Sequence, residues 1–375
     1  MEIEVALTDP LEARLVPRPA GRLRVGLVIP QSGPLGLTGP SALDAALLAA
    51  HEVNTGDRVR GRALDLVLVD GGRRPAEVAA EVAALTAVGA VDALVGFHTS
   101  DVHRAIETVV GGRTPYVFTP PHEGGRRRAG VVCLGPDPAR QLRGPIAWLT
   151  RTHLLRRWAL VGSDYIWPRS VHRHARRLVA EQGAAVVLEA RVPLGGVDER
   201  LDRLLDDLAT SRADAVLLSL VGRDLAAFNA AARAAGLDRR LVRLSGALEE
   251  NGLMASDGDR TGTLYAAMSS FTSLTDDAHL DLAARHAALL GPQAPVLDSY
   301  AEGVHDGIHL VASLASRDAL DALVATDRTP LSRSAPEVGA VRSRRGMHLA
   351  RAEAFGFEVV AGAPTGRTRD PSIWK

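Results

Sequence analysis

The chain has 375 residues, and its 44 basic and 44 acidic side chains give a formal net charge of zero. This balance excludes a global basic field of the kind that attracts nucleic acid or a membrane surface. The only lysine is Lys375 and the only cysteine is Cys133, which excludes phosphate-loop and Schiff-base lysine chemistry, disulfides within one chain and thiolate metal clusters.

Residues 1–22 begin with acidic side chains, are broken by prolines and contain no continuous apolar run or lipid-accepting cysteine. They do not read as a secretory signal. No stretch of the sequence approaches the roughly 20 apolar residues that span a bilayer. We therefore expect no membrane insertion and a cytoplasmic location; a periplasmic or extracellular location is the alternative if a leader has been removed.

From Leu23 onward, short aliphatic runs alternate with longer stretches of helical period. The strand-like runs "LRVGLVI", "ALDLVLVD" and "VDALVG" are separated by helical stretches such as "SALDAALLAAHEVN" and "RRPAEVAAEVAALTAVG". Continuous apolar strands joined by amphipathic helices specify βαβ units, and hence a parallel sheet with helices on both faces.

The rhythm restarts near Gly135, where a second βαβ series of similar size begins. Helices are expected at about 276–290 and 299–316, followed by two strand-like segments, one of them "AEAFGFEVVAG". The pattern predicts an α/β fold of two doubly wound parallel-sheet lobes joined by a hinge. The predicted divisions are an N-terminal extension (1–22), lobe 1 (23–135 and 270–325), lobe 2 (136–269 and 326–362) and a tail (363–375).

The loop "VGSDYIWPRS" at 161–170 places two large aromatic side chains after a predicted strand, in a chain with only 4% aromatic residues. Loops that leave the carboxyl ends of parallel strands converge on the crevice of such a sheet. We therefore expect Tyr165 and Trp167 to be exposed side chains that a ligand covers, with a packing pair as the alternative.

The strings "GLVIPQSGPLGLTGPS", "LVGFHTSDVHRAI", "TPPHEG", "LGPDPARQ" and "VGSDYIWPRS" together resemble the type I periplasmic-binding fold. Within it, the sequence is most similar to the branch that holds the amide-binding regulator of the aliphatic amidase operon and the urea and short-chain-amide binding proteins. The resemblance runs from about Leu23 to Gly362. It implies a small polar ligand held between two hinged lobes.

The resemblance also implies the residues that contact the ligand. Ser100 matches a hydroxyl that bonds the ligand's polar head at a helix start, although "TSD" would also make it an ordinary helix N-cap. Tyr165 matches the tyrosine that closes over the ligand, and His98 and Phe118 stand where relatives have other aromatic residues. The implied set is His98, Thr99, Ser100, Phe118, Thr119, Tyr165, Trp167, Val221, Gly222 and Met268.

Catalytic and metal-binding motifs give weaker signals. "HDGIH" sets His305 and His309 four residues apart on one helix face, but the sequence places no third ligand near them, so two ordinary histidines are favoured. No G-x-S-x-G nucleophile elbow is present. We expect no catalytic residues, no metal and no cofactor.

The leading hypothesis is a non-enzymatic cytoplasmic sensor of a short amide, urea or an amino-acid-like solute, which the resemblance links to an antiterminator-type partner. The alternative is the substrate-binding component of an ABC transporter of the branched-chain amino acid, urea and amide type, whose partner is a permease. A hydrolase of small amides is the third hypothesis. Direct nucleic-acid binding is not expected, and a homodimer is left open.

Overall fold

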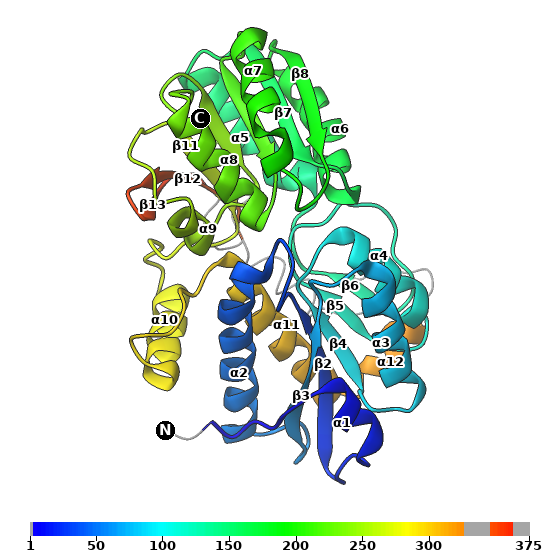
Figure 1. The fold of residues 1–375 in the computed structure, drawn as a ribbon. Coiled ribbons are helices and arrows are strands. Elements are labelled where there is room, and N and C mark those ends of the chain that lie inside the picture. Colours follow the sequence, from blue (N-terminus) through cyan, green and yellow to red (C-terminus); the bar gives the residue numbers. More distant parts are fainter. Residues whose placement is uncertain (1–2, 326–345, 363–375) are drawn as a thin grey trace. The chain divides into compact units, whose positions relative to one another are not determined.

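The computed structural model describes residues 3–325 and 346–362, and the chain divides into two compact units (Figure 1). The segments 326–345 and 363–375, which the sequence assigns to lobe 2 and the tail, lie outside the described residues. Unit 1 comprises Met1–Pro120, Gly125–Gly135 and Asp276–Arg344, and unit 2 comprises Pro121–Gly124, Pro136–Thr275 and Arg345–Lys375.

Unit 1 is built on a six-stranded parallel sheet with the strand order β1-β3-β2-β4-β5-β6. Its strands are β1 (Leu7–Thr8), β2 (Arg22–Ile29), β3 (Ala63–Asp70), β4 (Ala93–Gly96), β5 (Tyr116–Phe118) and β6 (Val131–Cys133). Its helices are α1 (Pro10–Leu15), α2 (Gly39–Thr55), α3 (Pro75–Ala87), α4 (Ser100–Val110), α10 (Asp277–Leu290), α11 (Ser299–Ser316) and α12 (Leu320–Ala325), with a 3-10 turn at Gly36–Thr38.

The strand order fixes which helix covers which face of this sheet. The crossover from β2 to β3 through α2 runs opposite to the next two, through α3 and α4. Because such crossovers are right-handed, α2 lies on one face and α3 and α4 on the other, as Figure 1 shows. Helix α11 packs beside α2, and a Cβ added at Gly307 would lie 2.8 Å from Val95 Cγ1. Glycine therefore lets α11 approach the sheet closely.

The N-terminal residues belong to the sheet of unit 1. Strand β1 pairs with β3, and α1 packs against α3. Asp9 caps α1 by accepting hydrogen bonds from the backbone N–H groups of Leu11 and Glu12. Part of the predicted N-terminal extension is thus an edge strand and a helix.

Unit 2 has a seven-stranded sheet with the order β13-β12-β11-β10-β9-β7-β8. Its strands are β7 (Arg157–Ser163), β8 (Ala185–Val192), β9 (Ala215–Ser219), β10 (Val242–Ser245), β11 (Leu264–Met268), β12 (His348–Glu353) and β13 (Gly356–Gly362). Its helices are α5 (Pro138–Thr152), α6 (Ile166–Glu181), α7 (Leu201–Ser211), α8 (Gly222–Ala234) and α9 (Glu250–Ala255), with a 3-10 turn at Asp198–Arg200.

Five strands of unit 2 are parallel, and the last two form an antiparallel hairpin on β11. The predicted strand-like segment "AEAFGFEVVAG" therefore contains the end of β12, a turn and β13. Ala354 in that turn has a φ of 57°. The predicted α/β class with two mostly parallel sheets is confirmed.

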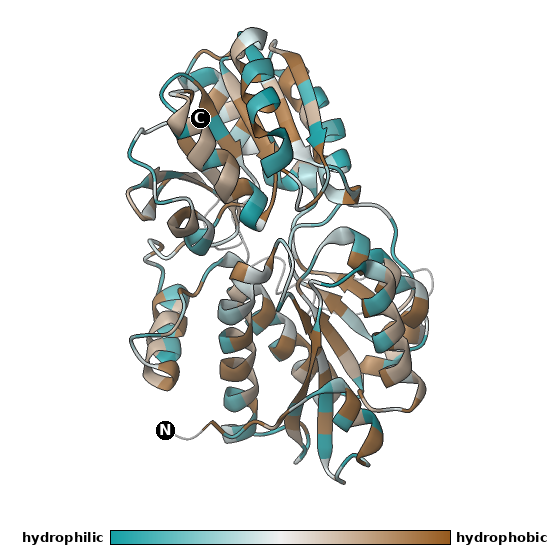
Figure 2. Ribbon diagram, viewed as in Figure 1, coloured by the Kyte–Doolittle hydropathy of each residue, from teal (hydrophilic) through white to brown (hydrophobic). Residues whose placement is uncertain are grey.

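Hydropathy follows the layers of each unit. The strands are mostly apolar, whereas the helices carry polar residues on their outer faces (Figure 2). This is the pattern of sheets buried on both sides. No helix within 3–325 or 346–362 is long and apolar enough to cross a membrane.

Candidate functional site

Each sheet has one point where the direction of its crossovers reverses. In unit 1 this point lies between β2 and β4, and in unit 2 it lies between β7 and β9. The loops that leave neighbouring strands diverge there, and such switch points are where α/β sheets bind ligands. We name them switch point 1 and switch point 2.

Switch point 1 holds three of the predicted residues. His98, Thr99 and Ser100 follow β4, and Thr99 is the N-cap of α4, although its side chain makes no capping hydrogen bond. Ser100 is the first helical residue and is buried. The alternative interpretation of Ser100 as the N-cap is off by one position, because Thr99 is the last residue with extended backbone angles.

His98 is the start of a buried chain of polar side chains. His98 Nδ1 donates to the Thr99 carbonyl at 3.1 Å, so its Nε2 accepts from the Tyr116 hydroxyl at 3.0 Å. The Tyr116 oxygen in turn lies 3.1 Å from His103 Nδ1, which donates to it. A Cβ added at Gly96 would lie 2.7 Å from His98 Nε2, so glycine at this position leaves space for the hydrogen-bonded side chains.

Burial keeps His98 neutral. Removal of the ring from water lowers the pKa of His98 from 6.5 to about 4, and the hydrogen bond to the Thr99 carbonyl opposes this shift only in part. At neutral pH the residue therefore offers a ligand no positive charge. An anionic head group would have to be held by backbone N–H groups and hydroxyls at this edge.

Phe118 and Thr119 follow the next strand, β5. The Phe118 ring stacks on His103 with centroids 4.1 Å apart and is fully buried in the core of unit 1. The Thr119 hydroxyl donates to the Gly96 carbonyl at 3.2 Å. Both side chains have partners inside unit 1, and their predicted contact with a ligand stays a prediction.

Switch point 2 contains the two aromatic residues of the "VGSDYIWPRS" segment. Tyr165 is the N-cap of α6 and Trp167 lies in its first turn, with ring centroids 6.5 Å apart. The prediction that they are exposed is wrong: only 5% and 4% of these residues are accessible. They are enclosed because the segment starts a helix rather than forming an open loop.

Two buried donors at switch point 2 make no hydrogen bond within the described residues. They are the Ser163 hydroxyl, at the end of β7, and the Trp167 indole N–H. Buried polar atoms in native proteins are nearly always paired, so these two donors remain available to an acceptor atom such as a water oxygen. Sequence reasoning missed Ser163, which it read as part of the turn.

The remaining predicted residues in unit 2 lie at or just beyond the ends of two other strands. Val221 is the N-cap of α8, again without a side-chain capping bond, and Gly222 is the first helical residue, with a φ of 51°. Both follow β9 and so belong to switch point 2. Met268 ends β11, two strands away from β9, and is buried. The fold therefore gathers Tyr165, Trp167, Val221 and Gly222 at one strand edge and leaves Met268 further along it.

The structure also aligns a serine, a histidine and a glutamate that no sequence pattern connects. The Ser219 hydroxyl lies 2.9 Å from His172 Nε2, and His172 Nδ1 lies 3.2 Å from Glu189. This is the order of a hydrolytic triad. Ser219 is fully buried, however, and its hydroxyl is already hydrogen-bonded to His172. Burial lowers the pKa of His172 despite the hydrogen bond with Glu189.

A cavity of unit 2 lies away from these residues. Its lining includes Arg233, Asp259 and Phe355. All the lining residues lie in segments that come before β10 or β11 or directly after β12. It therefore opens at the amino-terminal edge of the sheet, and none of the predicted ligand-contacting residues lines it.

Comparisons with known proteins give one consistent family. The family model described as "Periplasmic binding protein" matches residues 22–359. A periplasmic binding protein from Burkholderia mallei has 17% identity and a TM-score of 0.76, covering 95% of this chain and 100% of its own. A branched-chain amino acid transporter substrate-binding protein from Streptococcus pneumoniae, in complex with isoleucine, has 16% identity and a TM-score of 0.73, covering 91% and 98%.

A third solved structure is an ABC transporter solute-binding protein from R. palustris in complex with benzoate. It has 16% identity and a TM-score of 0.73, and the match covers 93% of this chain and 98% of the other. Similarity at this level of identity shows the shared fold, and the ligands differ among these relatives. The narrower resemblance to the amide-binding regulator is not confirmed by these matches.

The comparisons correct one prediction and favour an alternative. The cytoplasmic location is wrong, because the matching family consists of periplasmic and extracellular binding proteins. That prediction relied on residues 1–22 and on the lack of a bilayer-length apolar stretch, and neither identifies the compartment. The matches favour the transport alternative over the sensor. An antiterminator-type partner and a homodimer find no support among them.

Proposed function

Because the chain belongs to the periplasmic binding protein family, we propose that it is the substrate-binding component of an ABC importer, acts outside the cytoplasm without catalysing a reaction, and delivers a small solute to a permease. We further propose that residues at both switch points contact that solute. The observation that carries this proposal is the pair of buried donors at switch point 2, Ser163 Oγ and Trp167 Nε1, which have no partner among the described residues.

The chemistry of the two edges supports a ligand with acceptor oxygens. Thr99, Tyr165 and Val221 are N-caps whose side chains make no capping hydrogen bond. The first N–H groups of a helix have no partner within the helix, and its positive end favours a carboxylate or carbonyl oxygen. A carboxylate, an amide or urea provides such an oxygen.

Because His98 is neutral, it cannot balance the charge of an anionic ligand. With its pKa lowered to about 4 by burial, the imidazole adds no cation at neutral pH. The proposed class is therefore a small carboxylate, amino acid, amide or urea, and we expect recognition by hydrogen bonds rather than by an ion pair with His98.

Isothermal titration of the full chain with isoleucine, benzoate, acetamide and urea tests the proposal. We expect at least one of these probes to bind with one site per chain. Absence of saturable binding to all four at millimolar concentration would count against the proposed ligand class.

Substitution of Tyr165 then tests the site with the probe that binds. We expect Tyr165→Ala to weaken binding by about ten- to a hundredfold, because it removes an aromatic contact and a hydroxyl worth about 1–3 kcal/mol together. Tyr165→Phe separates the two contributions.

Tyr265→Phe is the matched control, since Tyr265 lies on β11 and its hydroxyl is 3.0 Å from His153 Nε2. An unchanged affinity in Tyr165→Ala would rule out Tyr165 as a ligand contact. Uptake of the same probe by cells that lack this gene, restored by the wild-type chain but not by Tyr165→Ala, would separate transport from sensing.

A further inference from the structure

Helices α2 and α11 of unit 1 are joined by three side chains outside both switch points. His305 Nε2 and His309 Nε2 on α11 lie 2.9 Å and 2.7 Å from the same oxygen, Glu52 Oε2 on α2. The two imidazole rings have centroids 4.5 Å apart. One potential ligand atom from each residue lies within 4.8 Å of the others. The cluster therefore has the residue types and the spacing of a metal-ligand set.

We propose that Glu52, His305 and His309 bind a divalent transition-metal ion, for which Zn²⁺ is the best fit. Two imidazole nitrogens and one carboxylate oxygen are a donor set that zinc takes in three-ligand sites, with a water in the fourth position. His309 has 39% of its side chain exposed, so solvent can supply that water. Calcium and magnesium prefer oxygen ligands and fit the set poorly.

The distances require only a small adjustment on binding. Zinc bonds of about 2.0–2.1 Å in a tetrahedral arrangement place the ligand atoms roughly 3.3 Å apart. The present nitrogen–oxygen distances are shorter by about half an ångström, because hydrogen bonds stand where the ion would lie. The half-exposed His309 and the partly buried Glu52 have room for this movement.

The surroundings of the cluster complete the site. His305 is buried, and its Nδ1 makes no hydrogen bond within the described residues, while Asp306 Oδ1 lies 4.0 Å away. When a metal takes Nε2, the ring proton moves to Nδ1, which faces this carboxylate. A carboxylate that accepts this proton orients the metal ligand and raises its basicity, and Asp306 would have to approach by about 1 Å to do so.

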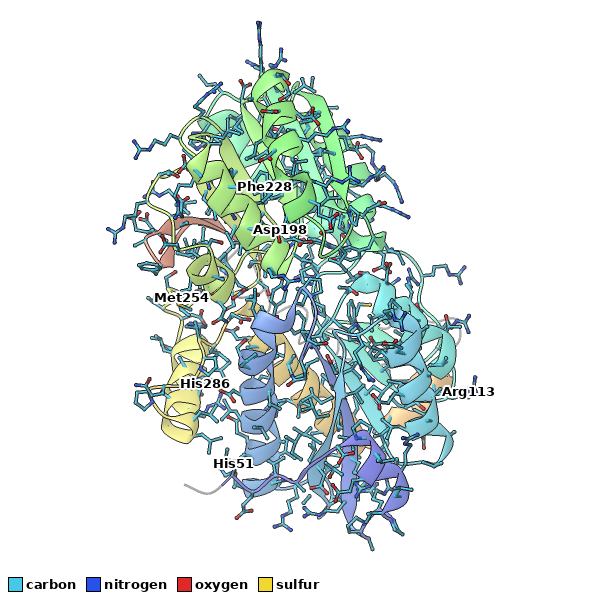
Figure 3. The ribbon with its side chains drawn as sticks, viewed as in Figure 1. His51, Arg113, Asp198, Phe228, Met254 and His286 are labelled. Atoms are coloured by element: carbon cyan, nitrogen blue, oxygen red, sulfur yellow. The ribbon has the colours of Figure 1, made fainter. Side chains whose placement is uncertain are left out.

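The charges near the cluster also favour a cation. Arg285 of α10 pairs with Glu52 Oε1 and with Asp281, so Glu52, Asp281 and Asp306 outnumber one guanidinium. His286, labelled on α10 in Figure 3, Asp44 on α2 and the ion pair of His279 on α10 with Glu302 on α11 are further titratable groups near this helix contact.

Equilibrium dialysis of the tag-free, chelator-treated full chain against Zn²⁺ tests the proposal. We expect one zinc ion per chain, a higher melting temperature in its presence, and no comparable effect of Mg²⁺. His309→Gln and Glu52→Gln should each weaken zinc binding about tenfold or more. Replacement of zinc by Co²⁺ should give the visible absorption of a tetrahedral site in the wild type and lose it in His309→Gln.

His174→Gln is the control, because His174 is a half-buried histidine of α6 whose Nδ1 bonds the Ser170 carbonyl of its own helix, in the other unit. It should bind zinc like the wild type. Circular dichroism without metal establishes whether each variant is folded. If His309→Gln is unfolded, the zinc affinity of Glu52→Gln tests the proposal instead. A lack of saturable zinc binding below millimolar concentration, or unchanged affinity in a folded ligand variant, would overturn the proposal.

Discussion

His98 shows how a single buried imidazole determines what a binding edge can offer. Its Nδ1 donates to the Thr99 carbonyl and its Nε2 accepts from the Tyr116 hydroxyl, so both nitrogens are satisfied in the neutral form. Protonation would turn the accepting nitrogen into a donor that faces a hydroxyl, in a place shielded from bulk solvent. Burial and the direction of these hydrogen bonds therefore act together against the charged form.

This arrangement predicts a loss of stability in acid. Since the pKa of His98 falls from 6.5 in an ordinary environment to about 4 in the fold, the unfolded chain binds a proton that the folded chain does not. The free energy of unfolding should fall as pH drops from about 6.5 to about 4, by up to roughly 3 kcal/mol from this residue. Unfolding titrations with guanidinium chloride across this range measure the effect.

His98→Gln is the informative variant, because an amide can donate and accept but does not titrate in this range. We expect its unfolding free energy to vary less with pH than that of the wild type, whereas His174→Gln should follow the wild type. Identical pH profiles for His98→Gln and the wild type would show that His98 is not the group responsible.

At the scale of the elements, β7, β9 and α6 meet around one glycine. A Cβ added at Gly162 would lie 2.2 Å from Ser219 Oγ and 2.9 Å from His172 Nε2. Because Gly162 has no side chain, the hydrogen-bonded series of Ser219, His172 and Glu189 can form in the interior of unit 2. Because Ser219 is buried and its hydroxyl is paired with His172, we interpret this hydrogen-bonded series as a buried polar connection between helix and sheet.

Gly162→Ala should therefore destabilise unit 2. We expect a loss of about 1–3 kcal/mol in the free energy of unfolding, since the added methyl group displaces Ser219 or His172. Ser219→Ala removes the nearest atom, so the double variant should lose less than the sum of the single losses in a double-mutant cycle. Gly356→Ala is the control, as nothing lies within 4 Å of a Cβ there. Additive losses would contradict the proposed clash.

The elements themselves were largely accessible to sequence reasoning. The helix expected at 299–316 begins and ends at those residues. Most strands were identified from continuous apolar runs between the helical stretches, because strands buried on both faces are apolar throughout. The N-cap of α4 is Thr99 rather than Ser100, and the sequence did not distinguish them because serine and threonine are both favoured at N-caps.

The contacts of the site were less predictable, because they depend on residues far apart in the chain. Glu52 lies 253 residues before His305, and Ser219 lies 47 residues after His172. No local pattern reports such pairs. The burial of Tyr165 and Trp167 was also missed, since exposure is set by the packing of α6 rather than by the segment's own composition.

At the scale of the whole molecule, neither unit is one continuous segment of chain. Unit 1 is interrupted after residue 135 and resumes at residue 276 with the helices α10 and α11. Helix α11 buries most of its residues and packs against α2 and β4. A large part of one sheet face of unit 1 is therefore covered by residues that come late in the sequence.

A fragment of residues 1–135 should accordingly fail to form a stable unit. Without α11, the face that it covers exposes a wide apolar surface, and such surfaces cause aggregation in incomplete domains. We expect the fragment to be insoluble or to lack a cooperative thermal transition by circular dichroism. A polypeptide that joins 1–135 to 276–316 through a flexible linker should recover part of that transition, and cooperative unfolding of residues 1–135 alone would contradict this account.

The same late arrival of α11 bears on biosynthesis. While a ribosome extends the chain, the first sheet emerges early, but its cover is complete only once Ser316 has been joined. Until then, the face of the sheet that α11 covers stays exposed as an apolar surface. It remains so while the ribosome translates the residues between 135 and α11. The order of the segments therefore delays burial of this apolar surface until α11 has been synthesised.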